Sequence, residues 1–227
     1  MPGSAKEIAK ELAILRNPKV FINLPIENII EVFKRMTTTE VKQNQTVIEQ
    51  GDAADYFYII KQGSAQVWQQ GLYDSEQKCV AQLEIGNHFG EEALVTEGTR
   101  NASIKMLTDG ILLKLNATDF KMLISQPVLD EVDYASAKSM IKEGVKILDV
   151  RYEEEYNEQH LADCQLIPLP ELRKRLSEIN PSDQYIAVCV SGKRSAVATI
   201  ILKQHNFNVV SLQGGLRDWP EEMISEH

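Results

Sequence analysis

The chain has 227 residues, a net charge of −9 and a hydrophobic fraction of 43%, which is typical of a globular protein with one or two domains. The acidic balance argues against non-specific nucleic-acid binding and against a basic membrane-surface role. No apolar run approaches the roughly 20 residues of a membrane span, and the start of the chain lacks the apolar core of a signal peptide.

Three widely spaced cysteines, Cys79, Cys164 and Cys189, form neither a disulfide framework nor a zinc pattern. The sequence therefore predicts a cytoplasmic protein with reduced thiols and no bound metal. We expect no nucleic-acid partner and no membrane partner. The sequence makes no prediction about the oligomeric state.

Helical spacing of apolar residues predicts two helices near the start of the chain, one over residues 5–15 and one from Pro25 onward. The apolar face of the second helix is formed by Ile26, Ile29, Ile30, Phe33 and Met36. From Thr39 the pattern changes to short β-rich runs between turn residues, which predicts a small antiparallel barrel or sandwich. The predicted strands cover residues 56–60, 65–68, 79–83, 104–107 and 111–115, and a helix over residues 119–125 follows.

The polar segment 126–131 has no periodicity and is the predicted domain boundary, with residues 1–127 before it and residues 128–227 after it. In the second domain, predicted strands and helices alternate. The apolar run over residues 145–150 is typical of a parallel strand that is buried on both faces. Further strands are predicted over residues 165–167, 185–188 and 208–212, and helices over residues 135–142, 153–159, 170–178, 196–204 and 216–223.

In the first domain, a Gly90-Glu91 pair precedes a short helical pattern, and Arg100 follows after a turn. A helix N-terminus, small residues and one guanidinium together suit a phosphate group. A carboxylate beside that position repels phosphate, so we expect Glu91 to accept a hydrogen bond from a sugar hydroxyl. The alternative is a surface ion pair between Glu91 and Arg100, which contributes little.

This stretch resembles the phosphate-binding cassette of cyclic nucleotide-binding domains, whose pattern is Gly-Glu-x-Ala-Leu followed by Arg-x-Ala-Ser/Thr. The resemblance covers roughly residues 15–125 and implies an antiparallel β-barrel of the jelly-roll type with flanking helices. It implies that Glu91 binds the ribose 2′-hydroxyl and that Arg100 pairs with the cyclic phosphate. The implied binding residues are Gly90, Glu91, Ala93, Arg100, Asn101 and Ala102.

The cassette departs from the family pattern at two positions, Thr99 and Asn101. Thr99 stands in the place of a frequent proline, and Asn101 in that of a small residue or threonine. The choice between cAMP, which we favour slightly, and cGMP therefore stays open. We expect Arg100→Ala to abolish cyclic nucleotide binding and to leave the fold intact.

In the second domain, an apolar strand ends at Cys189, and a loop of small and basic residues leads into a helix. Unpaired N–H groups and the helix dipole favour an anion there, so this thiol is expected to lose its proton readily. The loop consists of Val190, Ser191, Gly192, Lys193 and Arg194, and its two basic residues add positive charge near the sulfur. Cys189 is therefore the candidate nucleophile.

The order of motifs around Cys189 resembles that of rhodanese domains from about residue 130 to the end, and implies an α/β fold with a parallel central sheet. The motifs are Asp149-Val150-Arg151, His160-Leu161, Cys189-x-x-Gly192-x-Arg194 and Gly214-Gly215-x-x-x-Trp219. The resemblance implies that Cys189 takes sulfur from a donor such as thiosulfate as a persulfide and passes it to a thiol or cyanide-like acceptor. The resemblance also implies that the loop from Val190 to Arg194 binds the substrate: its backbone N–H groups would hold the sulfur, and Lys193 and Arg194 would attract the donor. Asp149 and Arg151 would organise the loop and the strand end.

The sequence argues against three other interpretations of this loop. A nucleotide P-loop is rejected because Ala187 replaces the first glycine. A cysteine phosphatase or an arsenate reductase needs a longer gap between its cysteine and its arginine. A buried, inert cysteine is a fitting description of Cys79 and Cys164 but not of Cys189. His160 is expected to be structural, and Trp219 to anchor the end of the chain in the core.

The combined prediction is a sulfurtransferase that is regulated by a cyclic nucleotide, in which the ligand of the first domain modulates Cys189. A non-enzymatic signalling or scaffold protein that uses the rhodanese fold for partner binding is the alternative. A transcription factor is disfavoured by the acidic charge and by the α/β pattern after residue 130.

Overall fold

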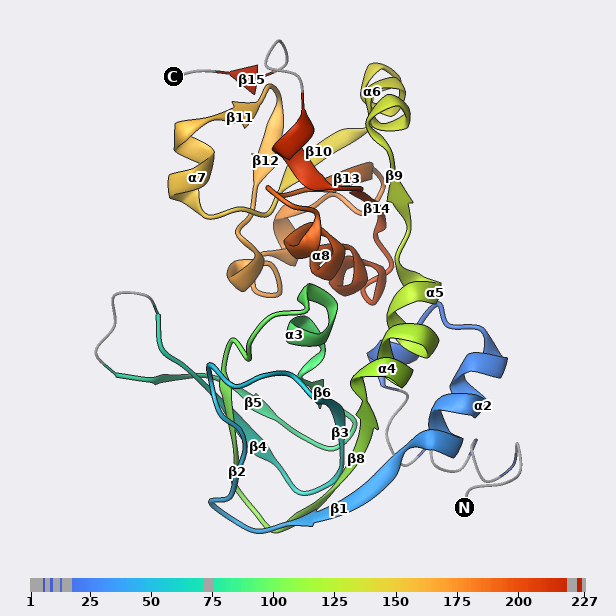
Figure 1. Cartoon of the computed structure of the whole chain (residues 1–227), viewed down its shortest axis with the longest axis vertical. Helices are drawn as coiled ribbons and strands as arrows, with labels where there is room; N and C mark the ends of the chain where they lie inside the picture. The colour runs from blue at the N-terminus through green and yellow to red at the C-terminus, as the bar shows by residue number, and fades with distance from the viewer. Residues whose placement is uncertain are drawn as a thin grey trace. The chain divides into compact units, whose positions relative to one another are not determined.

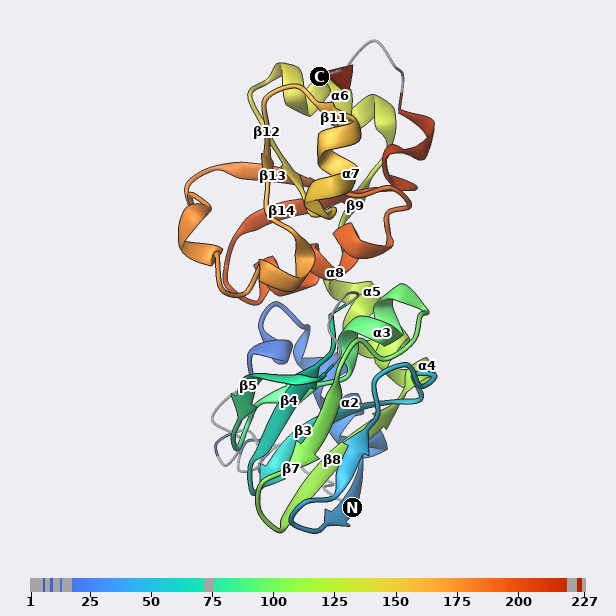
Figure 2. The same cartoon turned by 90° about the vertical axis from the view of Figure 1, so that its left-hand side faces the viewer.

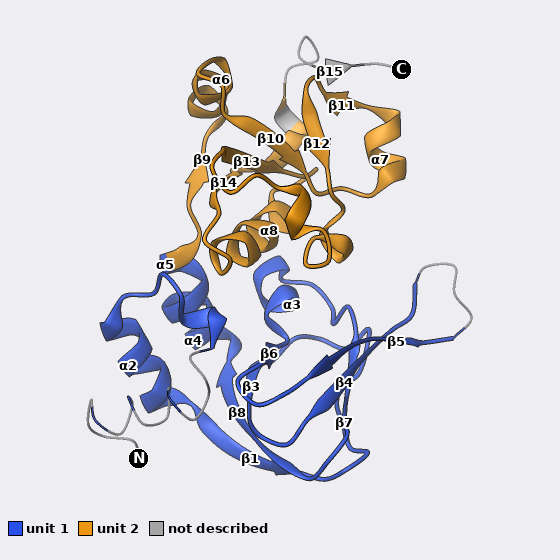
Figure 3. Cartoon of the chain, turned by 180° about the vertical axis from the view of Figure 1, so that it is seen from behind, with its two compact units in different colours: residues 1–127 blue, residues 128–227 orange. Residues whose placement is uncertain are grey.

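The computed structural model describes residues 18–71, 76–219 and 224–225, together with positions 6, 9 and 13. The chain divides into two compact units, residues 1–127 and residues 128–227 (Figures 1 and 3). The helix predicted over residues 5–15 falls almost wholly outside the described residues. None of the described helices combines the length and apolar character that a membrane crossing requires.

The first unit is a sandwich of two antiparallel sheets (Figure 2). Each sheet has four strands, in the orders β1-β8-β3-β6 and β2-β7-β4-β5. The first sheet contains β1 (Thr37–Val41), β3 (Tyr56–Gln62), β6 (His88–Phe89) and β8 (Gly110–Asn116). The second contains β2 (Thr46–Ile48), β4 (Ala65–Gln69), β5 (Lys78–Leu83) and β7 (Ser103–Met106). The predicted antiparallel fold is confirmed.

The sandwich is closed by apolar side chains that point inward from both sheets. The core cluster contains Val41, Ile48, Tyr58, Ile60, Ala65, Phe89, Ile104, Met106 and Leu112. The alternation of side chains along each strand places these residues on one face and leaves the other face for the helices. On that other face Phe57 of β3 packs against Phe120, with ring centroids 5.0 Å apart.

Short helical segments flank the sandwich: η1 (Lys19–Phe21), α2 (Ile26–Arg35), α3 (Glu91–Thr96), α4 (Ala117–Phe120), η2 (Lys121–Ser125) and α5 (Gln126–Val128). The helix predicted from Pro25 is α2, and Pro25 precedes its first residue. One residue of its predicted apolar face, Ile26, is 56% exposed because it lies at the very start of the helix, whereas Val32 is fully buried. The helix predicted over residues 119–125 is divided between α4 and the π-helical turn η2.

The second unit is built on a five-stranded parallel sheet with the order β12-β10-β13-β14-β9. Its strands are β9 (Glu131–Val132), β10 (Lys146–Asp149), β12 (Cys164–Leu166), β13 (Gln184–Val188) and β14 (Asn208–Leu212). A separate antiparallel pair joins β11 (His160–Leu161) to β15 (Ile224–Ser225). The helical elements are α6 (Tyr134–Lys142), α7 (Glu153–Glu158), α8 (Lys193–Lys203) and the 3-10 turns η3 (Leu169–Glu171), η4 (Leu176–Glu178) and η5 (Gly215–Asp218). The predicted α/β fold is confirmed.

The parallel sheet has a helix on each face. α6 contributes Ala137 to the core cluster that also contains Val188 and Leu212, while α8 packs on β13 and β14 (Figure 1). Because neighbouring side chains of a strand point to opposite faces, Ser211 points away from the cluster that holds Leu212. Ser211 therefore faces α8, the helix that follows Cys189.

Two helix predictions in the second unit are wrong. The segment 170–178 forms the 3-10 turns η3 and η4, because the chain leaves the helical conformation at Arg175 (φ −109°, ψ 16°). The guanidinium of Arg175 binds Glu171 and Glu178 and so ties the two turns together. In the segment 216–223 the structure shows only the turn η5, after which Trp219 is extended, and residues 220–223 lie outside the described part of the chain.

Candidate functional site

The candidate ligand site of the first unit lies at the start of α3. Gly90 precedes this helix in the left-handed conformation (φ 86°), which glycine adopts without strain. A side chain at this position would also collide with Arg100, because an added Cβ would lie 2.7 Å from Nη1. Glycine at position 90 thus lets a buried guanidinium lie beside the backbone that opens α3.

Arg100 is oriented mainly by neutral carbonyl groups. Nη1 donates to the carbonyl of Gly90 (2.8 Å), and Nη2 donates to that of Tyr56 (2.8 Å). Nη2 also binds Asp55 at 3.0 Å, but the Asp55 side chain is 65% exposed and that of Arg100 only 3%. A carbonyl oxygen orients a guanidinium without cancelling its charge, so much of the charge of Arg100 stays available for an anion.

The other residues of the cassette are close to Arg100 in the sequence and differ in their exposure to solvent. Glu91 and Ala93 are buried, as is Arg100, so a pair between Glu91 and Arg100 would be buried and not on the surface. Ala102 is half-buried and Asn101 is exposed. The Asn101 side chain donates to the Glu92 carboxylate at 2.6 Å, which ties the residue after Arg100 to α3, a contact that the sequence did not predict.

The candidate nucleophile of the second unit lies between a strand and a helix. β13 ends at Val188, Cys189 follows with its side chain fully buried, and α8 begins at Lys193. Gly192 occupies the N-cap position of α8 with a left-handed backbone (φ 82°), which lets the chain turn back toward the sulfur. The helix starts three residues earlier than predicted, so Lys193 and Arg194 belong to its first turn.

The Cys189 sulfur takes the place of a helix-capping side chain. The backbone N–H of Ser195, the third residue of α8, donates to Sγ at 3.4 Å, which is the donor that an N-cap side chain normally satisfies. The thiol in turn donates to Ser195 Oγ (3.6 Å), and Ser195 Oγ lies 2.9 Å from Ser211 Oγ. Sequence reasoning missed both serines, because Ser211 comes from β14 and no local pattern connects it with the loop.

The Gly214-Gly215 pair supports the cysteine loop from the other side. An added Cβ at Gly215 would lie 2.3 Å from the Cys189 carbonyl oxygen and 2.5 Å from the Gly192 nitrogen. The N–H of Leu216, the next residue, donates to the same carbonyl at 2.8 Å. The motif therefore needs a glycine at position 215 because the two backbones touch there.

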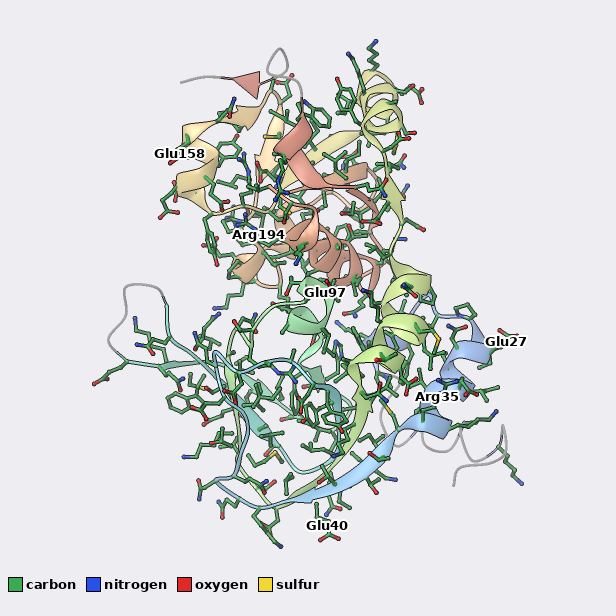
Figure 4. The ribbon with its side chains drawn as sticks, viewed as in Figure 1. Glu27, Arg35, Glu40, Glu97, Glu158 and Arg194 are labelled. Carbon is green, nitrogen blue, oxygen red and sulfur yellow. The ribbon has the colours of Figure 1, made fainter. Side chains whose placement is uncertain are left out.

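Arg194 does not face the sulfur as a free charge. Figure 4 labels Arg194 in the second unit. Its two terminal nitrogens bind the two carboxylate oxygens of Glu155 at 2.6 Å each, and its guanidinium lies over the Tyr152 ring. The Glu155 carboxylate raises the pKa of Arg194, and Arg194 lowers the pKa of Glu155. Lys193 is exposed. Within the described part of the chain, it is the one of the two expected donor-attracting cations that no carboxylate holds in a bidentate pair.

The rest of the loop divides into exposed and buried residues. Val190 is exposed, Ser191 is half-buried and Gly192 is buried. The N–H of Arg217 donates to the Val190 carbonyl at 3.1 Å, which fixes this part of the loop to η5.

Asp149 and Arg151 form a buried pair at the end of β10. Asp149 accepts from Arg151 through Nε, Nη2 and the backbone N–H, and Arg151 also donates to the Gln159 carbonyl. His160 stacks on Tyr156 with ring centroids 4.0 Å apart, and its Nδ1 lies 3.0 Å from the Tyr156 carbonyl oxygen. Burial raises the pKa of Tyr156 to about 12.

The remaining cysteines differ from each other. Cys79 is exposed on β5, so the expectation that it is a buried residue is wrong. β5 lies at the edge of its sheet, and most of its residues are exposed. Cys164 is half-buried, and burial raises the pKa of its thiol. The described part of the chain contains no cluster of three or more His, Cys, Asp or Glu side chains that could hold a metal ion.

Comparison with known proteins yields two matches to protein families along the chain. The model of the cyclic nucleotide-binding domain matches residues 38–127, and the model of the rhodanese-like domain matches residues 133–222. The putative sulfur carrier protein YrkF of Bacillus subtilis (strain 168) is 41% identical over 78 residues, which is 34% of this chain and 42% of that protein.

A second curated relative is a kinase regulatory subunit. The cAMP-dependent protein kinase regulatory subunit of Blastocladiella emersonii is 27% identical over 144 residues, which is 63% of this chain and 34% of that protein. This chain thus spans less than half the length of both curated relatives. The regulatory domain of Toxoplasma gondii PKA with cAMP matches with a TM-score of 0.50 and 21% identity over 62% of this chain and 51% of that chain, a likeness of fold alone. The chain therefore joins a cyclic nucleotide-binding domain, residues 38–127, to a rhodanese-like domain, residues 133–222.

Proposed function

We propose that this protein is a sulfurtransferase whose activity responds to a cyclic nucleotide. The observation that carries the catalytic part is the Cys189 sulfur, which accepts the Ser195 N–H in the first turn of the 11-residue helix α8. A helix N-terminus stabilises a thiolate, and a thiolate is the reactive form of cysteine. The sulfur carrier relative supports sulfur as the group that is transferred.

The proposed reaction has two half-reactions. The Cys189 thiolate attacks the outer sulfur of a donor such as thiosulfate, an S–S bond forms, and the donor's S–S bond breaks so that its electron pair leaves with sulfite. A thiol or cyanide-like acceptor then attacks the outer sulfur of the persulfide, and the electron pair returns to Cys189 as thiolate. Three cysteines without disulfides suit a reducing, cytoplasmic compartment.

Mass spectrometry of the intact protein tests this proposal. After incubation with thiosulfate and removal of the excess, the protein should gain the mass of one sulfur atom, and cyanide should remove it. Cys189→Ser is the matched control and should gain nothing, while Cys79→Ser should behave as the wild type. A gain that persists in Cys189→Ser, or no gain in the wild type, contradicts the proposal.

In the first unit we propose that Arg100 pairs with the cyclic phosphate, Glu91 binds the ribose 2′-hydroxyl, and backbone N–H groups near Ala93 and Asn101 assist. The buried, carbonyl-oriented guanidinium of Arg100 supports an anionic ligand, and the kinase regulatory relative supports a cyclic nucleotide. Of the two common bases we favour adenine. Titration calorimetry with cAMP and cGMP tests the ligand and its base, and heats that match dilution for both contradict the assignment.

The regulatory part of the proposal rests on the first residues of the second unit. The backbone carbonyl of Asp130 accepts from the Ser211 N–H (2.8 Å), and that of Val132 accepts from the Gln213 N–H (2.9 Å), so this segment is bound to β14. Lys203, the last residue of α8, donates to the Val128 carbonyl (2.9 Å) and forms an ion pair with Asp130.

The segment that follows the nucleotide-binding unit is thus tied to both elements that hold the cysteine. β14 carries Ser211, and α8 carries Ser195, the residue that binds the Cys189 sulfur. A shift of residues 128–132 would move one or both elements relative to the sulfur. We propose that ligand binding to the first unit acts on Cys189 by this route.

A further inference from the structure

We propose that Ser195 is a further catalytic residue, whose hydroxyl turns toward Cys189 Sγ each time the sulfur carries a negative charge, and that Ser211 is its positioning residue. The proposal deepens the sulfur-transfer function above and rests on it in part. Both serines are fully buried and lie outside the loop that family resemblance marks as the substrate site.

The hydrogen bonds around Ser195 are complete while Cys189 is protonated. The thiol donates to Ser195 Oγ (3.6 Å), and Ser195 donates its single hydroxyl proton to the Gly192 carbonyl (3.0 Å). Ser211 Oγ lies 2.9 Å from the same oxygen. A hydroxyl accepts two hydrogen bonds and donates one, so Ser211 is the donor of its pair with Ser195 in this state.

Loss of the thiol proton changes the direction of one bond in this set. A thiolate can only accept hydrogen bonds, and a hydrogen bond to a charged acceptor is stronger than one to a neutral carbonyl. The Ser195 hydroxyl therefore rotates from the Gly192 carbonyl to Sγ. The Gly192 carbonyl is not left unpaired, because the Ala196 N–H donates to it at 3.0 Å. Ser211 continues to donate to Ser195 Oγ, which strengthens the Ser195 hydroxyl as a donor.

The rotation of the Ser195 hydroxyl affects the rate of the second half-reaction, in which the acceptor removes the outer sulfur. When the persulfide forms, the negative charge moves to the outer sulfur, and Sγ becomes an uncharged member of an S–S bond. When the acceptor removes the outer sulfur, the electron pair of the broken S–S bond returns to Sγ, which leaves as thiolate. A donor to that thiolate lowers the barrier to its departure, whereas attack by an already formed thiolate gains nothing from the same donor.

The two half-reactions should therefore respond differently to Ser195→Ala. The rate of sulfur release to cyanide is expected to fall roughly ten- to hundredfold, the value of a hydrogen bond to a charged group. The rate of loading from thiosulfate at about pH 10, where thiols are largely ionised, should stay within about threefold of the wild type. The midpoint of the pH profile for alkylation of Cys189 by iodoacetamide should move upward by about one unit or more.

Single-turnover kinetics of the full chain, with the Cys189 peptide followed by mass spectrometry, measure these quantities. Ser211→Ala should change release in the same direction but only about two- to tenfold, and it tests the proposal where Ser195→Ala does not fold. In Ser195→Ala the additional Ser211→Ala change should have no further effect, because Ser211 acts through Ser195. The matched control is Thr199→Val, since Thr199 has a buried hydroxyl in α8 without a hydrogen-bond partner in the described residues. Thr199→Val should leave all three measurements unchanged.

Two results would overturn the proposal: equal slowing of loading and release in Ser195→Ala, which indicates general damage, or an alkylation profile identical to that of the wild type. If the wild type takes up no sulfur, the proposed sulfur transfer fails, and the alkylation profiles of Ser195→Ala and Ser211→Ala still decide the role of the serines.

Discussion

Arg100 in the first unit and Arg194 in the second were both expected to meet an anion, and their surroundings differ. Arg100 is oriented by the carbonyls of Gly90 and Tyr56 and touches one exposed carboxylate, that of Asp55. Arg194 binds both oxygens of the half-buried Glu155 carboxylate. Neutral oxygens orient an arginine without neutralising its charge, which stays available to a ligand. A bidentate carboxylate both orients the arginine and neutralises its charge.

This difference assigns the two arginines to different tasks. Arg100 is suited to bind an anion directly. Arg194 connects α8 with α7 through Glu155 and so fixes the first turn of the helix that follows Cys189. In the second unit, the groups left to stabilise an anionic sulfur or donor are therefore the Ser195 N–H at Sγ and the exposed Lys193.

The largest effect is expected at Arg100. Arg100→Lys keeps the charge but loses the planar fork that reaches Gly90 and Tyr56, so affinity for the cyclic nucleotide should fall at least about a hundredfold. Because the side chain is buried, the free energy of unfolding should also fall, by about 1–3 kcal/mol, while the fold stays intact. Titration calorimetry and urea unfolding measure the two effects.

Asp55→Asn is the control for Arg100, because it removes only the exposed partner. Its affinity should stay within about threefold of the wild type. Equal losses of affinity in Asp55→Asn and Arg100→Lys would show that the Asp55 carboxylate, and not the carbonyl groups, holds Arg100 in its binding orientation.

The next effect concerns the backbone contact behind Cys189. Gly215→Ala places a Cβ 2.3 Å from the Cys189 carbonyl oxygen, so the free energy of unfolding should fall by about 2–4 kcal/mol. Gly214→Ala is the matched control, since Gly214 has a similar φ of 74° but nothing within 4 Å of an added Cβ. It should lose only about 1 kcal/mol, the cost of the left-handed conformation. Equal values in urea unfolding would show that the close approach is not what requires glycine.

A smaller effect is expected when the charge of Arg194 is released. Glu155→Gln removes the carboxylate partner, so the KM for thiosulfate should fall about three- to tenfold at low salt and recover as salt is added. The control is Glu154→Gln, which changes the net charge equally on the exposed side of the same helix. The same KM change in both variants would contradict the assignment of Arg194 as an already paired cation.

The smallest effect is a pH dependence of stability. Arg194 lowers the pKa of Glu155 in the folded state, so the pair stabilises the fold in full above the unfolded value of 4.5 and loses this contribution as the pH falls through the folded value. We expect about 1 kcal/mol or less, because the pair is partly exposed and screened. Urea unfolding at about pH 7 and about pH 3 should show this loss in the wild type and not in Glu155→Gln. An identical pH dependence in the two proteins would contradict it.

Much of the fold was predictable from local pattern. The aromatic and β-branched run that became β3, and the apolar runs that became β10 and β13, have the composition of buried strands. The threonine-rich β1 and the two-residue β9 were missed, because their structure depends on pairing with β8 and β14 and not on their own composition.

The candidate sites were predictable where the chemistry lies in one stretch of sequence. The cysteine loop and the glycine before α3 are of this kind. The partners that determine what each charge does come from distant elements: Glu155 lies 39 positions before Arg194, and Ser211 lies 16 positions after Ser195. The sequence alone therefore led to the prediction that Arg194 attracts the donor, and the structure shows this arginine paired with Glu155.

The claim that joins the two units is tested most directly by the rate of sulfur transfer from thiosulfate to cyanide, measured with and without saturating cAMP. We expect cAMP to change the rate, or the KM for thiosulfate, by about fivefold or more in the wild type. The change should disappear in Arg100→Lys and shrink in Lys203→Met, which removes the contacts to Val128 and Asp130 while its basal rate stays unchanged. Identical kinetics with and without cAMP, in protein shown by calorimetry to be saturated, would contradict the account.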